Sequence, residues 1–182
     1  NTPPRMPLAV MENGSGGYRW PRSGDKWEAK GTPLYYAWPQ NKTRDGGGRP
    51  TDPDYVERFY IEDNGTSGGK LEAEAGLPEQ GTLTGSDGTV YNIYKYDPTG
   101  TSVTIYAEDG EGVRGAGIIS GLLHEVTLEG NGGLFGSSRS VTVYRSDGSS
   151  LTGGDLEVPT MPGFYLSGWT EGGNTVTFPR TV

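Results

Sequence analysis

The stretch of sequence that decides the fold is Val126-Thr-Leu-Glu-Gly-Asn-Gly-Gly133, followed by Val141-Thr-Val-Tyr144. In both segments apolar residues alternate with polar ones, which is typical of a half-buried β-strand. The Asn-Gly pair that ends the first segment favours a tight turn, because glycine has no Cβ and asparagine tolerates positive φ angles. The two segments therefore predict short antiparallel strands.

The same pattern recurs along the rest of the chain. Alternating segments occur at 55–61, 89–96 and 103–107, and shorter ones follow the quoted stretch at Leu156/Val158, Phe164/Leu166 and Val176/Phe178. Turn dipeptides such as Asn13-Gly14, Asn64-Gly65 and Asp147-Gly148 separate them. Helix formers gather only at 69–77, where one helical turn and a strand fit equally well. We therefore expect an all-β or nearly all-β protein built from antiparallel sheets.

Composition divides the chain into three predicted regions. Residues 1–50 are rich in Pro and Gly and hold three of the four Trp residues, which predicts an irregular region with one or two strands. Residues 51–121 are expected to form an antiparallel β domain that ends at a Gly-rich run. Residues 122–182 are expected to form a separate small β module.

The third region also carries the run Leu156-Glu-Val-Pro-Thr-Met-Pro-Gly-Phe-Tyr-Leu-Ser-Gly-Trp169. Together with the stretch quoted first, it resembles the Listeria–Bacteroides repeat of internalin-type surface proteins and some phage proteins. The resemblance implies a β-grasp-like module that acts as a spacer or an adhesion element. Its signature falls on Asn131, Gly132, Gly133, Pro162, Gly163, Phe164, Gly168 and Trp169. It also implies that the 162–164 segment makes an entry turn and that Trp169 caps the core.

Modules of that family usually close with a strand of the form Leu-Tyr-Ala-x-Trp, and Leu34-Tyr-Tyr-Ala-Trp38 is similar to it. Two interpretations follow. In the first, this aromatic strand packs within its own chain. In the second, it completes the open sheet edge of the next chain, because edge strands expose unpaired backbone groups.

Two further segments, 56–66 and 86–94, resemble parts of the family 11 xylanases. On that resemblance Glu57 is the nucleophile of a retaining glycosidase. This chemistry requires a second carboxyl group about 5 Å away as the acid/base. The sequence has no carboxylate at the place where that family has its acid/base. The favoured interpretation is therefore that Glu57 lies on an edge strand, partly in water or paired with Arg58 or Lys70.

The charge balance limits the partners. The formal net charge is −8, and a field of this sign repels nucleic-acid backbones and anionic membranes. No apolar run approaches the roughly 20 residues that cross a bilayer, so no membrane insertion is expected. The chain has no cysteine, which excludes disulfides and thiolate metal sites. No metal or other cofactor is predicted, although the acidic loops at 52–54 and 108–111 leave calcium as an alternative.

One group of aromatic residues near the N-terminus is a candidate ligand site. Trp and Tyr rings stack on sugar rings, and several on one surface form a platform for glycans. The alternative is that a Gly-rich domain uses its few large aromatics as core. The residues are Trp20, Trp27, Tyr35, Tyr36 and Trp38.

These observations predict a non-enzymatic structural or adhesive module, exposed on a bacterial cell surface or on a phage particle. Its expected partners are other protein subunits, either copies of itself or capsid and surface proteins, and surface glycans. Self-assembly by strand addition belongs to the same hypothesis. The alternatives are a carbohydrate-binding module and a family 11-like glycosidase with Glu57 as nucleophile.

Overall fold

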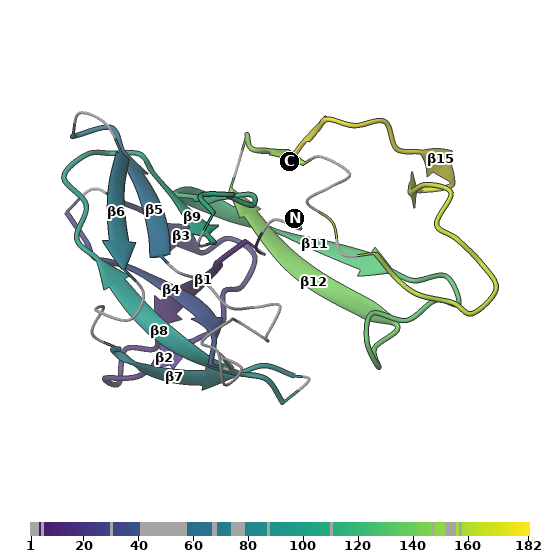
Figure 1. Ribbon diagram of the computed structural model, residues 1–182, viewed down its shortest axis with the longest axis horizontal. Coiled ribbons are helices and arrows are strands. Elements are labelled where there is room, and N and C mark those ends of the chain that lie inside the picture. Colours follow the sequence, from purple (N-terminus) through teal and green to yellow (C-terminus); the bar gives the residue numbers. More distant parts are fainter. Residues whose placement is uncertain are drawn as a thin grey trace.

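The computed structural model describes residues 4, 6–29, 31–40, 58–66, 69–73, 79–86, 88–109, 111–146, 148–151, 156 and 158–182, with the backbone alone at 69–73 and 150. Within these residues every regular element is a β-strand, and every strand pair is antiparallel (Figure 1). The predicted all-β class is therefore confirmed. For the segment 69–77 the sequence fitted either a helical turn or a strand. The structure has a strand over Gly69–Ala73.

Nine of the ten described strands between residues 8 and 119 form two main sheets. The five-stranded sheet has the order β2-β1-β4-β8-β7, and its strands are Tyr18–Arg19, Leu8–Glu12, Leu34–Pro39, Val90–Tyr96 and Gly81–Thr84. The four-stranded sheet has the order β10-β9-β5-β6, with strands Ile118–Ile119, Val103–Glu108, Arg58–Asp63 and Gly69–Ala73.

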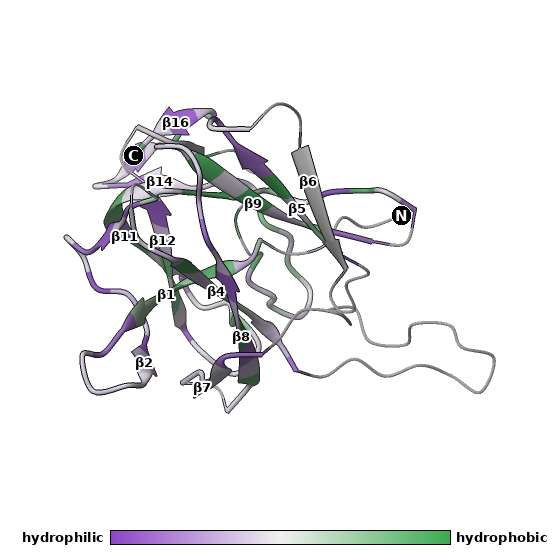
Figure 2. Ribbon diagram, turned by 90° about the vertical axis from the view of Figure 1, so that its left-hand side faces the viewer, coloured by the Kyte–Doolittle hydropathy of each residue, from purple (hydrophilic) through white to green (hydrophobic). Residues whose placement is uncertain are grey.

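The two sheets pack face to face around an aromatic core. Tyr36 and Tyr94 from the five-stranded sheet contact Phe59 from the four-stranded sheet, with ring centroids 5.0 and 5.4 Å apart. All three side chains are fully buried, and each contributes about 1.5–3 kcal/mol of transfer free energy. Figure 2 shows hydrophobic residues in the interior strands of both sheets. We call this β-sandwich-like unit the sandwich.

The predicted boundary at residue 50 does not separate two packing units. β4, from the first predicted region, pairs with β8 from the second over six residues, from Leu34↔Tyr96 to Pro39↔Tyr91. The first region also contains β1, β2 and β3 (Lys26–Trp27), which is more regular structure than its Pro and Gly content predicted. Composition does not reveal the pairing of β4 with β8, because the two strands lie about 60 residues apart in the sequence.

A long hairpin connects the sandwich to the C-terminal module. It consists of β11 (Gly121–Glu129) and β12 (Ser140–Ser146), as the quoted stretch predicted. At its start, Gly121 and Leu122 pair with β3, and Leu123 is buried in the sandwich core. Further along, Leu128 is buried in a second core on the other side of the strand.

The second core is completed by the C-terminal segment, which runs beside the hairpin (Figure 1). The short pairs β13–β16 (Ser150–Leu151 with Arg180–Thr181) and β14–β15 (Thr170–Glu171 with Asn174–Thr175) hold this segment. The strands predicted at 164–166 and 176–178 are absent from the described residues. Pro159 and Pro162 remove two backbone donors there, and the described part of 158–169 makes only a single bridge, Leu134↔Thr160.

β4 contradicts the use of Leu34–Trp38 as a donated strand. It lies in the middle of the five-stranded sheet, with β1 on one edge and β8 on the other. Tyr36 and Trp38 are 0% and 1% exposed, so donating this strand would require the sandwich core to open. The structure therefore follows the first interpretation, in which the strand packs within its own chain.

Candidate functional site

The predicted glycan platform is split by the five-stranded sheet. Trp27, Tyr36 and Trp38 are buried in the sandwich core, at 2%, 0% and 1% exposure, and offer no face to a ligand in solution. Trp20 and Tyr35 are partly exposed and lie on the opposite, outer face of the sheet. The five residues therefore do not form one surface, because neighbouring positions such as Tyr35 and Tyr36 point to opposite faces of a strand.

The outer face carries a different aromatic group. Tyr18 packs on Tyr35 with centroids 5.0 Å apart, and Trp20 meets Tyr91 edge-on at 5.1 Å. The Trp20 indole Nε1 donates a hydrogen bond to the carbonyl of Thr84 at 3.0 Å, which fixes its orientation. All four rings are partly exposed. Sequence reasoning missed Tyr18 and Tyr91. The available signal for Tyr91 was its position in the strand predicted at 89–96, where successive residues point to opposite faces.

The signature residues of the C-terminal module form two turns. Gly133 N donates to Gly130 O at 2.9 Å across Asn131 (φ 46°) and Gly132 (φ 97°), a turn with two positive φ angles. Phe164 N donates to Met161 O at 3.0 Å across Pro162 and Gly163, whose φ is 80°. The dihedral signs explain the glycines at both turns.

The two aromatic residues of the signature have different environments. Trp169 packs on the second core and stacks on Phe135. Phe164 is 71% exposed, and the adjacent Tyr165 is 89% exposed. Large apolar side chains held in water on an ordered segment are typical of interaction surfaces.

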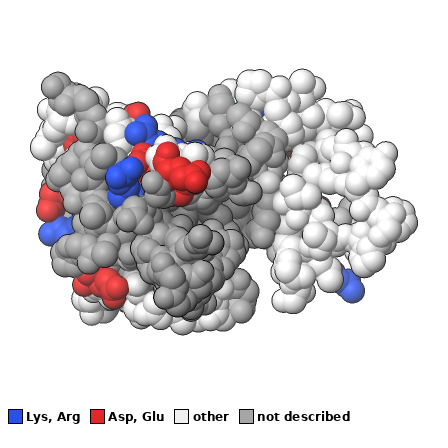
Figure 3. All heavy atoms as spheres, in the orientation of Figure 1, with Lys and Arg blue, Asp and Glu red and all other residues white. Residues whose placement is uncertain are grey.

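These exposed residues border an open groove. It has a volume of about 1080 Å³ and lies between β11 and the segment 159–182. Val126, Leu128, Trp169 and Phe178 contribute apolar lining, and Glu125 and Glu129 lie on its β11 side. On the face seen in Figure 3, charged side chains of described residues gather over the sandwich, whereas the C-terminal module presents mostly uncharged ones. We call this feature the C-terminal groove.

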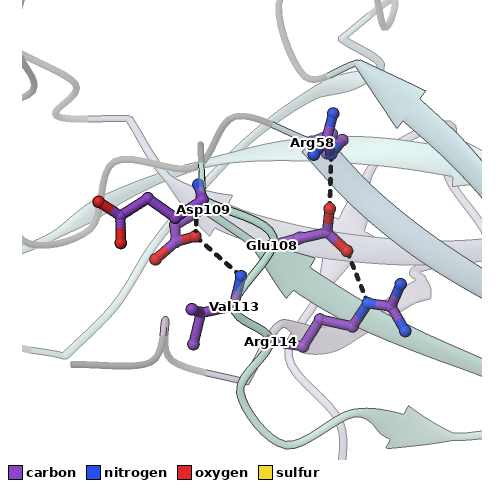
Figure 4. A network of polar contacts seen from close by, with 6 residues as sticks. Arg58, Glu108, Asp109, Val113 and Arg114 are labelled. Atoms are coloured by element: carbon purple, nitrogen blue, oxygen red, sulfur yellow. Dashed lines mark hydrogen bonds and ion pairs between the residues drawn. The ribbon is translucent and has the colours of Figure 1, made fainter. Parts of the chain in front are cut away.

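A buried carboxylate on the outer face of the four-stranded sheet is held between two arginines (Figure 4). Glu108 is 3% exposed, and its Oε1 and Oε2 accept bonds from Arg58 Nε and Arg114 Nε, both at 2.6 Å. Burial raises the pKa of Glu108, but the bonds from Arg114 and Arg58 outweigh it and hold the pKa below its usual range. Arg114 also stacks on the Tyr60 ring, 3.4 Å from its centroid. With both oxygens occupied, this arrangement is a structural clamp.

A second buried carboxylate, Asp63, ties two loops to the sandwich. It accepts hydrogen bonds from Gly65 N, Thr99 N and the Tyr96 hydroxyl, each at 2.8 Å. Burial raises its pKa, but the bonds from the Thr99 and Gly65 amides and from Tyr96 outweigh it and lower the pKa to about 2. Asp63 is therefore ionised and fully used as a structural acceptor.

The other residues that the sequence suggested were the catalytic candidate Glu57 and the acidic loops considered for calcium. Glu57 lies outside the described residues, and so do Asp52 and Asp54. Asp109, from the acidic loop considered for calcium, accepts hydrogen bonds from Glu111 N and Val113 N at 2.9 Å, so the loop closes on its own backbone. Among the described residues, no group of three His, Asp or Glu side chains is arranged to hold a metal ion.

Two further findings concern membrane-spanning helices and similarity to known proteins. In the part of the chain that the structure covers, no helix is long and apolar enough to cross a membrane. Protein-family models, curated proteins and solved structures were compared with the chain, and none of them matches it.

Proposed function

We propose that the chain is a non-enzymatic structural and adhesive module, displayed outside a bacterial cell or on a phage particle. The observation that carries the proposal is the C-terminal groove with its exposed rim. Phe164 and Tyr165 are 71% and 89% exposed next to an open groove of about 1080 Å³ that is lined by both apolar and polar residues, which suits the docking of another macromolecule.

The use of the charged groups supports the same proposal. Glu108 and Asp63 are the least exposed carboxylates among the described residues. The oxygens of each accept hydrogen bonds from other residues of the sandwich. A general acid or a nucleophile needs an oxygen that is free to meet a substrate. These two buried carboxylates stabilise the sandwich instead.

The resemblance to the Listeria–Bacteroides repeat adds a second line of support. Its turn positions coincide with the positive φ angles of Gly132 and Gly163, and Trp169 packs on the second core. The β-grasp-like arrangement that the resemblance implies stays a prediction, as does the setting on a cell or virion surface.

Adhesion is tested with the fluorescently labelled chain, intact cells of the bacterium that carries the gene, and the corresponding phage particles. We expect saturable binding to one of these surfaces. A Phe164→Ser/Tyr165→Ser double variant should lose the binding and keep its thermal unfolding, because both side chains are largely exposed. A Trp20→Ala variant is the matched control, since it removes an aromatic ring from the sandwich and leaves the groove intact.

The proposal fails if neither surface binds the chain. It also fails if the chain hydrolyses a polysaccharide, which a reducing-sugar assay on xylan measures directly.

A carbohydrate-binding module is the second candidate function. The favouring observation is the outer aromatic face of the five-stranded sheet, where Tyr18, Trp20, Tyr35 and Tyr91 are partly exposed. A glycan array distinguishes the two candidates. Binding that Trp20→Ala abolishes and the Phe164/Tyr165 double variant retains would assign the function to this face.

A further inference from the structure

The strand β11 has one paired edge and one edge that is open over most of its length. β12 pairs with it from Leu123 to Glu129. On the other edge, β3 pairs only with Gly121 and Leu122, and two more backbone hydrogen bonds follow at Leu123. From residue 124 to residue 129, no strand in the described part of the chain pairs with this edge.

The hydrogen bonds at both ends of β11 show which backbone groups face the open edge. Leu123 N donates to Asp25 O at 2.8 Å, and Leu123 O accepts from Gly24 N at 3.0 Å, so Leu123 points away from β12. Gly130 N donates to Arg139 O at 2.9 Å, so Gly130 points toward the β12 side.

The register between these ends has no break, and successive residues of a strand point their backbone groups to alternate sides. The N–H and C=O groups of Glu125, Thr127 and Glu129 therefore face the open edge. At about 3.4 Å per residue, the open stretch of 124–129 is roughly 20 Å long. This is a row of main-chain donors and acceptors with the spacing of a β-ladder.

The C-terminal groove lies along this same edge. Its lining includes every residue from 124 to 129 and, opposite them, Trp169 and Phe178 from the C-terminal segment. Trp169 and Phe178 are only partly buried. An added strand would cover their exposed apolar area and satisfy the backbone groups at the same time.

The side chains of β11 define the chemistry of that strand. Val126 and Leu128 face the second core, whereas Glu125, Thr127 and Glu129 are exposed on the other face. Neither Glu125 nor Glu129 forms an ion pair with another described residue. A strand laid along this edge places residues directly opposite those of β11, and opposite charges stabilise such pairs. It must therefore alternate apolar residues with Lys or Arg.

A second copy of this chain does not fit. Two copies joined edge to edge through β11 would bring Glu125 and Glu129 of one beside the same acidic strand of the other, in chains that each carry a net charge of −8. Like charges on paired strands are destabilising. The charge pattern therefore selects a different polypeptide.

We propose that the open edge of β11 binds an extended segment of a partner protein as an added β-strand, with its apolar residues in the C-terminal groove and its basic residues beside Glu125 and Glu129. This inference rests on the proposed adhesive function and gives it a partner of defined chemistry. Main-chain bonds along the edge supply the affinity, and the alternating side chains supply the specificity.

The test uses two capped synthetic peptides in which Val alternates either with Lys or with Glu, titrated into the ¹⁵N-labelled chain. In the free chain, the amides of Val126 and Leu128 should exchange slowly, and those of Glu125, Thr127 and Glu129 should exchange fast. The Lys peptide should slow the three fast amides. The Glu peptide should bind about tenfold more weakly at low salt, the scale of two cross-strand charge pairs.

Two threonines of the hairpin provide a matched pair of variants. Thr127 and Thr142 are directly opposite each other and both exposed, but the N–H of Thr127 faces the open edge of β11 and that of Thr142 faces the far side of β12. Proline removes the N–H and blocks pairing on its side of the strand. Thr127→Pro should abolish binding of the Lys peptide, and Thr142→Pro should retain it.

A Glu125→Lys/Glu129→Lys variant keeps the test decisive if a proline variant does not fold. It should reverse the preference and bind the Glu peptide more tightly than the Lys peptide. The proposal is overturned if neither peptide protects the three amides, if both peptides bind equally, or if Thr127→Pro binds like the parent chain. If the chain adheres to cells or phage particles but binds neither peptide, only this inference fails. If it binds the Lys peptide but adheres to neither surface, only the proposed function fails.

Discussion

Phe135 and Trp169 stack almost in parallel, with ring centroids 6.5 Å apart and an interplanar angle of 12°. The contact joins the loop of the β11–β12 hairpin to the C-terminal segment. Among the described residues, the second core has four buried apolar side chains, including Phe135 and Leu128. A core of this size depends heavily on each large side chain, so this stack is a principal tie between the hairpin and residues 158–182.

Trp169→Ala should therefore destabilise the C-terminal module by about 3 kcal/mol, at the low end for large aromatic truncations because Trp169 is only partly buried. Urea unfolding followed by near-ultraviolet circular dichroism measures the loss. Tyr165→Ala is the control, since its side chain is 89% exposed and its loss should change stability by less than about 0.5 kcal/mol. Equal stability of the two variants would show that the stack contributes little.

Asp63 predicts an acid-dependent loss of stability. Its pKa is lowered from 3.8 to about 2, so the folded state favours the ionised carboxylate. The stabilisation is complete above about pH 4 and is lost as pH falls toward 2, because the unfolded chain then binds the proton more readily. A shift of this size corresponds to roughly 2 kcal/mol.

Asp63→Asn should remove most of this pH dependence between 4 and 2 and lower the stability at neutral pH, because the amide is a weaker acceptor for the Thr99 N–H. Asp97→Asn is the control, since the Asp97 side chain is 74% exposed. Thermal unfolding measured across this pH range checks both variants. An unchanged acid limb in Asp63→Asn would assign the effect to other carboxylates.

The clamp at Glu108 should be sensitive to loss of charge. Glu108→Gln leaves Arg58 and Arg114 facing each other without the carboxylate that bridges them, and should cost about 2 kcal/mol, the scale of hydrogen bonds to charged groups. Glu62→Gln, on the same sheet but exposed, should be close to neutral. Chemical denaturation of the two variants compares them, and a neutral result for Glu108→Gln would mean that the arginines find other partners.

Local patterns predicted the strands that alternate strongly. Val103, Ile105 and Ala107 share one face of β9 and are all buried, as their spacing implied. The hairpin turn at Asn131 was equally visible, because a turn with two positive φ angles favours Asn-Gly. In both cases the information lies within a few adjacent residues.

Long-range pairing was not visible in the same way. Alternation in Leu34–Trp38 does not reveal that β4 is a central strand, because this depends on β1 and β8 on either side. The same limit applies to the candidate site. Glu125 and Glu129 look like ordinary exposed residues in sequence, and only the short length of β3 leaves their edge open. At Phe164 and Leu166 the alternation was present, but no partner strand among the described residues pairs with it.

Two glycines of the signature in the C-terminal module differ in whether their backbone conformation requires glycine. Gly132 has φ 97°, a conformation that costs about 1–2 kcal/mol for a residue with a Cβ, and the added atom would also lie 3.4 Å from Met161 Sδ. Gly168 has no positive φ, and a Cβ there would meet nothing within 4 Å. Gly132→Ala should therefore destabilise the module by about 1–2 kcal/mol. Gly168→Ala should be neutral or stabilising by up to about 1 kcal/mol, because alanine reduces the freedom of the unfolded chain. Thermal unfolding of the two variants provides the comparison. A larger loss of stability in Gly168→Ala than in Gly132→Ala would contradict the prediction.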